Sequence, residues 1–199
     1  MRWSEACERN REPILTVLRQ WLPPGARVLE IGSGSGQHAV AFSRSLAGVR
    51  WQASDHPDAV APLNERLRSE GPLPEALALN VQEQQQWPRL DYDAVFSANT
   101  CHILPQAGVS SLLALAAAVL QPGGLLLLYG PFQDGGVHTA ASNAAFDAHL
   151  RSLDPEMGVR DALALRAEAL ALGLTDEAEV AMPANNRMLI FRQNTDPLI

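Results

Sequence analysis

Apolar positions along the chain alternate between helical spacing and strand-like runs. The segment 10–21 carries Ile14, Val17 and Leu18 at helical intervals, which predicts a helix that ends before Pro23. Five further segments have helical spacing: 37–47, 57–70, 106–120, 142–152 and 159–172. Seven apolar runs predict strands: 27–32, 49–55, 75–81, 92–99, 125–131, 175–183 and 187–193.

The order of these segments predicts an α/β fold. Strands and helices alternate over most of the chain, which is typical of a mostly parallel sheet covered by helices on both faces. The last two strands follow each other without a helix, so we expect them to form an antiparallel pair. We expect one domain over residues 1–199, in which 1–25 form an N-terminal helix and a possible lid.

Composition narrows the class of protein. The 15 basic residues are all arginine and are scattered among 22 acidic residues, giving a net charge of -7, so nucleic acid is an improbable partner. The longest apolar runs are too short to span a membrane, and the N-terminus lacks an apolar signal core. Cys7 and Cys101 form no disulfide framework or zinc motif, which favours a cytoplasmic protein.

The stretch VLEIGSGSGQHA, residues 28–39, predicts a glycine-rich turn between a strand and a helix. Such a turn lets a ligand approach the backbone, either a dinucleotide pyrophosphate or the amino-acid portion of S-adenosylmethionine (SAM). Read from Gly34, the pattern also fits G-x-G-x-x-A, with Asp55 21 residues further on. A P-loop is excluded because no Gly-Lys pair follows. A tight turn without a ligand is the remaining alternative.

Four motifs together resemble the class I SAM-dependent methyltransferases over residues 26–193. They are VLEIGSGSG, YDAVFSAN, LQPGGLLLLYGP and the closing strand pair. ERNREPIL, SGSGQHAVAF, FSANTCHI, SNAAFDAHLRSLDPEMGVRD and MPANN further resemble one methyltransferase-like family that is known as a domain of unknown function. The resemblance implies a Rossmann-like, seven-stranded sheet, SAM as methyl donor and S-adenosylhomocysteine as product. It does not imply a particular acceptor.

The same resemblance assigns the cofactor residues. It places five residues in the first SAM-binding motif: Glu30, Gly32, Ser33, Gly34 and Gly36. Glu30 would orient the loop or hold the ammonium group through water. Asp55 would accept hydrogen bonds from the ribose hydroxyls; its alternative is to cap the helix that begins at Pro57.

Three further residues complete the expected cofactor site. Asn80 stands where the superfamily often has an acidic residue facing the adenine amino group, and its side-chain oxygen can accept from that group. Val81 would offer its backbone N–H to the adenine ring. Asn99 ends the fourth strand, at the sheet edge where ligands gather, and would face the methionine portion or the acceptor.

His102 is the candidate general base, since imidazole titrates near neutral pH. Its alternative is a structural role, and the neighbouring Cys101 is expected to be a small buried residue. Five residues are candidate acceptor contacts: Arg9, Asn10, Phe132, His138 and Asn143. For Asn185-Asn186 we favour a turn. No spacing indicates a metal site.

The predicted function is transfer of a methyl group from SAM to a small molecule. One alternative is a catalytically silent protein that binds SAM or a partner. The other is an NAD(P)-dependent oxidoreductase, which is disfavoured because the chain lacks the second mononucleotide-binding half of a dinucleotide fold. The sequence does not indicate an oligomeric state.

Overall fold

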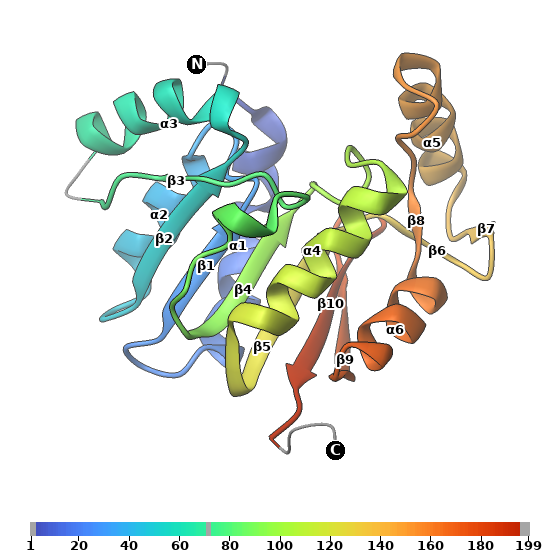
Figure 1. Ribbon diagram of the computed structural model, residues 1–199. Coiled ribbons are helices and arrows are strands. Elements are labelled where there is room, and N and C mark those ends of the chain that lie inside the picture. The colour runs from blue at the N-terminus through green and yellow to red at the C-terminus, as the bar shows by residue number, and fades with distance from the viewer. Residues whose placement is uncertain (1–2, 71–72, 196–199) are drawn as a thin grey trace.

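A seven-stranded sheet forms the centre of the computed structural model, which describes residues 3–70 and 73–195 (Figure 1). The strand order is β3-β2-β1-β4-β5-β10-β9. The strands are β1 (Arg27–Ile31), β2 (Arg50–Asp55), β3 (Leu77–Ala78), β4 (Tyr92–Ala98), β5 (Leu120–Gly130), β9 (Leu174–Met182) and β10 (Asn186–Gln193). The first five are parallel, whereas β10 is antiparallel to both β5 and β9. The predicted mixed sheet is confirmed.

Helices cover both faces of this sheet. One face packs against α1 (Glu5–Trp21), α2 (Gln37–Ser45) and α3 (Pro57–Glu70), and the other against α4 (Gln106–Val119) and α6 (Ala162–Ala171). Alternate residues of β5 belong to the two cores: Leu127 packs on the α1 side and Leu126 on the α4 side. The remaining helix, α5 (Ala141–Leu153), projects from one end of the sheet, at the upper right of Figure 1.

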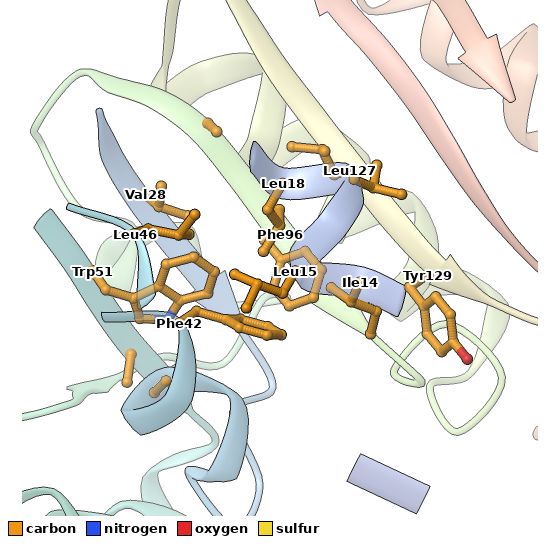
Figure 2. Packing of buried hydrophobic residues seen from close by; sticks show 14 of the residues in the cluster. Ile14, Leu15, Leu18, Val28, Phe42, Leu46, Trp51, Phe96, Leu127 and Tyr129 are labelled. Atoms are coloured by element: carbon orange, nitrogen blue, oxygen red, sulfur yellow. The ribbon is translucent and has the colours of Figure 1, made fainter. Parts of the chain in front are cut away.

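The core beneath α1 is aromatic. Figure 2 shows Phe42, Trp51 and Phe96 gathered between α2 and the sheet, with Ile14 and Leu18 of α1 beside them. Phe96 contacts the other two rings with centroids 5.9 and 5.7 Å apart. All five side chains are at most 3% exposed. Burial of this size fixes α1 and α2 against the sheet, and α2 begins at the glycine loop.

The N-terminal helix is longer than the sequence pattern predicts. It begins at Glu5 rather than at residue 10, and Ser4 caps it by accepting the Cys7 N–H at 3.3 Å. Pro13 therefore lies inside the helix and not in its first turn. The missed turn carries few apolar residues, so hydrophobic periodicity alone does not reveal it.

Other differences concern short elements. β3 contains two residues rather than seven, while β5 begins at Leu120, earlier than expected. The helix expected from residue 159 begins at Ala162, because Asp161 accepts two amides of its first turn. A second sheet, β7-β6-β8, and a 3-10 helix, η1, are not predicted by periodicity. They are β6 (Phe132–Asp134), β7 (Val137–His138), β8 (Arg160–Asp161) and η1 (Gln84–Gln86).

Candidate functional site

A cleft of about 790 Å³ opens at the carboxyl ends of β1, β2 and β4. This edge of a parallel sheet is where ligands usually bind in open α/β folds. Its wall combines backbone of the glycine loop with apolar side chains. The lining residues are Ser4, Ala6, Cys7, Ile31, Gly32, Ser33, Gly34, Ser35, His38, Asp55, His56, Ala59, Leu79, Asn80, Val81, Ala98, Asn99, Thr100, His102, Ile103, Leu104 and Phe146.

The glycine loop forms the floor of the cleft. Gly32 has φ +73, and a Cβ at that position would lie 2.6 Å from Thr100 Oγ1. Gly34 has φ +54, and a Cβ there would meet nothing within 4 Å. The first glycine is therefore required by packing, whereas the second leaves open space over the backbone. Gly36 caps α2 and does not line the cleft.

Asp55 ties the end of β2 to this loop. Its Oδ2 accepts the Gly34 N–H at 2.6 Å, and its Oδ1 accepts the His56 N–H at 2.7 Å. The carboxylate forms no bond to the amides of Asp58 or Ala59 in the first turn of α3, so the alternative role as a helix cap is not observed. Each oxygen keeps a lone pair for a ligand hydroxyl.

Glu30 lies below the loop and does not line the cleft. Its Oε2 accepts hydrogen bonds from Ser33 Oγ and Trp51 Nε1, both at 2.9 Å. Burial raises the pKa of Glu30 to about 7, despite those two donors. Glu30 thus contacts the loop from behind through Ser33, and its orienting role stays a prediction.

Asn80 and Val81 belong to the far wall. Asn80 Oδ1 accepts the Gln82 N–H at 3.0 Å, so this oxygen already takes part in a turn. Its expected contact with an adenine amino group requires the second lone pair. Val81 is buried and adds apolar surface to the wall.

Asn99 and His102 follow β4 on the opposite side of the cleft. Asn99 has φ +58, a left-handed conformation that asparagine tolerates. A Cβ on Gly130 would lie 3.9 Å from both Asn99 Oδ1 and His102 Nδ1, so both side chains lie beside the end of β5. Burial and the nearby Arg160 guanidinium lower the pKa of His102 to about 4, so its imidazole is neutral at pH 7.

The two α1 candidates for acceptor contacts do not reach the cleft. Arg9 is exposed and pairs with Glu5 at 3.5 Å. Asn10 is buried, where its Oδ1 lies 2.7 Å from His38 Nε2. Asn10 therefore joins α1 to α2, and its position does not support a direct contact with an acceptor.

The three later candidates also lie off the cleft wall. Phe132 is buried under the Arg187 guanidinium, 5.8 Å from its ring centroid. His138 Nε2 lies 3.6 Å from Asp147 Oδ2. Asn143 donates to the Asn185 carbonyl oxygen at 3.0 Å. His138 and Asn143 fix α5 to its neighbours, whereas Phe132 belongs to the core beneath α4 and α6. The role of these three residues as acceptor contacts stays a prediction that their positions do not support.

The structure adds residues that sequence reasoning missed. Cys7 from α1, Ile103 after β4 and Phe146 from α5 all line the cleft. The Phe146 ring lies edge-on to His102, with centroids 5.0 Å apart. The expected turn lies one residue earlier, with φ +58 at Ala184 and Asn185, and Asn186 begins β10 and donates its N–H to the Pro183 carbonyl oxygen. No local signal marks Phe146, because the position of α5 depends on long-range contacts.

The described part of the chain holds neither a cluster of metal-ligand side chains nor a membrane-spanning helix. Within 3–70 and 73–195, no three His, Cys, Asp or Glu side chains come together in a way that could hold a metal ion. The helices of the same ranges include none that is long and apolar enough to cross a membrane.

Comparison with known families identifies the chain. Residues 1–193 match the family described as "Protein of unknown function (DUF938)". The chain belongs to the DUF938 family. This agrees with the predicted resemblance to a methyltransferase-like domain of unknown function, and a DUF938 description assigns no substrate.

Solved structures show which fold this DUF938 protein has. An O-methyltransferase family protein from Burkholderia thailandensis matches with TM-score 0.82 and 18% identity, over 97% of this chain and 59% of that one. Mitomycin 7-O-methyltransferase matches with TM-score 0.77 and 22% identity, over 93% and 54%. Human N-acetylserotonin methyltransferase in complex with SAM matches with TM-score 0.76 and 17% identity, over 96% and 53%.

These likenesses establish a class I methyltransferase-like fold. They show the fold alone, because the sequence identities lie at or below 22%. The chain spans between 53% and 59% of the length of these three proteins. Some similar structures contain SAM or its product, as in the human enzyme and in CalO1 with S-adenosylhomocysteine.

Proposed function

We propose that this DUF938 protein is a SAM-dependent methyltransferase with a small-molecule acceptor. The observation that carries the proposal is the cleft at the carboxyl edge of the sheet, whose floor is bare glycine backbone and whose rim carries Asp55. Its volume of about 790 Å³ is within the range of small-molecule sites.

The residues present fit SAM. The open space over Gly34 admits the methionine portion, and the positive end of α2 favours its carboxylate. Asp55 would accept from the ribose hydroxyls, while Leu79 and Val81 supply an apolar wall for adenine. When bound, SAM supplies an electrophilic methyl group. The protein's own part is to align the acceptor and exclude water.

His102 would accept the proton of the acceptor. Its neutral imidazole lies at the cleft wall with little solvent around it, at 7% exposure. A neutral imidazole can accept a proton from a hydroxyl within hydrogen-bond distance. Its lowered pKa makes it a weaker base than the near-neutral imidazole expected from the sequence, so the proposal favours an acidic hydroxyl such as a phenol. Cys101 does not compete as a nucleophile, because burial raises the pKa of its thiol to about 12.

The topology argues against an NAD(P)-dependent oxidoreductase. Beyond β5 the sheet continues with the antiparallel pair β10 and β9, instead of the parallel strands that make up the second half of a dinucleotide fold. A catalytically silent SAM-binding protein remains the second candidate.

An assay with methyl-labelled SAM separates these functions. Purified protein is incubated with labelled SAM and with fractionated metabolite, protein and nucleic-acid pools from cells. We expect S-adenosylhomocysteine to form with the label in a metabolite fraction. Label in protein or nucleic acid would refute the small-molecule acceptor, and SAM binding without any product would favour the silent protein.

A further inference from the structure

The end of the cleft beside His102 has an apolar mouth. Ile103 and Phe146 line it and remain 48% and 36% exposed, although both are large apolar side chains. Cys7 lines the cleft from α1, and burial raises the pKa of its thiol, which favours the uncharged form. Exposed apolar surface that borders a cleft is typical of a site for an apolar ligand.

Charged side chains are scarce on this wall. Among the described residues that line the cleft, Asp55 is the one carboxylate or guanidinium, and it sits at the glycine loop, where it accepts two backbone amides. His38 and His102 are neutral at pH 7, since burial lowers the pKa of each to about 4.

The nearest arginines have other partners. Arg160 lies close to His102, but its guanidinium donates to the Cys101 carbonyl oxygen at 3.0 Å, to the Leu104 carbonyl oxygen, and to the Glu156 carbonyl oxygen at 2.7 Å. Arg160 is also absent from the cleft lining. An anion held against Phe146 and Ile103 would lose part of its water there, and the described lining residues offer no guanidinium to pair with it.

We infer that the methyl acceptor is an uncharged hydroxyl compound with an apolar body, held between Phe146, Ile103 and His102. This inference rests on the proposed methyltransferase function. The acceptor O–H donates to the neutral His102 ring, the oxygen forms the new C–O bond to the transferred methyl, and the proton passes to the imidazole. An ammonium group has no carboxylate partner at the mouth among the described lining residues, so it is disfavoured for the same reason as a carboxylate.

Three matched probes test the inference. Each is a naphthol with one substituent on its second ring, which is hydroxymethyl, carboxylate or aminomethyl. Calorimetry measures their binding to the complex of the protein with S-adenosylhomocysteine, so that the result does not depend on turnover. We expect the neutral probe to bind at least about tenfold more tightly than either charged probe. Equal or tighter binding of a charged probe, or no binding of the neutral one, would overturn the inference.

A designed reversal sharpens the test. Ile103→Arg places a guanidinium at the mouth and should shift the ratio of carboxylate to neutral affinity by about tenfold toward the carboxylate. The control Leu170→Arg adds the same charge at an exposed apolar position of α6 that does not line the cleft, and should leave the ratio unchanged. Equal shifts in both variants would contradict a local effect at the mouth.

The proposed methyltransferase function and the proposed acceptor class can be refuted separately. If the wild-type protein binds neither SAM nor S-adenosylhomocysteine, the proposed function fails. If it binds them and methylates a charged probe in preference to the neutral one, the function stands and the acceptor class is wrong.

Discussion

At the scale of single residues, Gly34 and Gly36 have similar backbone conformations but different surroundings. Both have positive φ, +54 and +75. A Cβ on Gly36 would lie 2.8 Å from Leu63 Cδ1 of α3, whereas a Cβ on Gly34 would enter the open cleft. The sequence motif contains both glycines without distinguishing them. The structure shows that Gly36 is needed for packing against α3, whereas Gly34 leaves space for a ligand.

Alanine substitutions should reveal this difference. Gly36→Ala should lower the free energy of unfolding by about 1–3 kcal/mol through strain and overpacking. Gly34→Ala should have a smaller effect on stability but weaken SAM binding, because its methyl group occupies the cleft. Urea unfolding and calorimetry measure the two effects. Equal losses of stability with unchanged SAM affinity would contradict the assignment.

His102 is tested by its effect on turnover. His102→Gln should lower kcat by roughly 10²-fold, the lower end of the usual contribution of a general base because its pKa is lowered to about 4, with little change in the Kd of SAM. Cys101→Ala should keep kcat, since the buried thiol is protonated and does not line the cleft. A His102→Gln variant with full turnover would remove the general-base role.

Glu30 makes stability depend on pH. The raised pKa means that the folded state favours the protonated carboxyl, so this stabilisation is complete below the unfolded value near 4.5 and is lost as pH rises through about 7. Glu30→Gln keeps an acceptor for Ser33 and Trp51 without ionising. Relative to this variant, the wild type should lose about 3 kcal/mol of unfolding free energy between pH 4.5 and 8.5.

Urea unfolding at several pH values measures this loss. Glu65→Gln, at an exposed position of α3, serves as the matched control and should follow the wild-type profile. Parallel profiles for the wild type and Glu30→Gln would contradict the buried, protonated carboxyl.

At the scale of elements, the start of α1 is fastened to the start of α2 by Gln37. Its Oε1 accepts the Ser4 N–H at 2.7 Å, and its Nε2 donates to the Ser4 carbonyl oxygen at 3.1 Å and to Glu8 Oε1 at 2.8 Å. This fastening brings Ser4 and Cys7 to the cleft wall. A lid formed by residues 1–25 stays a prediction. Such a lid would be anchored to α2 by the hydrogen bonds between Gln37 and the start of α1.

Gln37→Ala should release the first turn of α1. We expect a loss of about 1–3 kcal/mol of unfolding free energy, because four hydrogen bonds of a buried side chain disappear, three of them to the first turn of α1 and its cap. Hydrogen exchange at Cys7 and Glu8 should become faster. Gln20→Ala, an exposed position of the same helix, is the control and should change neither. Unaltered exchange in Gln37→Ala would refute the fastening.

The elements differ in how far the sequence predicts them. Long periodic segments such as β4 and α4 are predicted to within a residue or two, since their apolar pattern matches their burial. The position of α5 depends on contacts that no local pattern encodes. The Gly158 N–H donates to the His102 carbonyl oxygen at 2.9 Å, and the Val159 N–H donates to Asp147 Oδ1 at 2.7 Å. The sequence therefore does not predict that Phe146 lines the cleft.

At the scale of the whole molecule, motif order predicts more than any single motif. The glycine loop alone is compatible with a dinucleotide or with SAM, but the antiparallel end of the sheet favours SAM. The acceptor side is less accessible to sequence reasoning, because its wall comes from α1, from the segment after β4 and from α5. The cytoplasmic location and the single domain stay predictions.

Direct binding of SAM tests the central claim. Isothermal calorimetry of the purified wild-type protein should show saturable SAM binding at one site per chain, weakened by Gly34→Ala, and no comparable binding of NADH. Tighter binding of NADH than of SAM, or no SAM binding by a folded protein, would contradict the account.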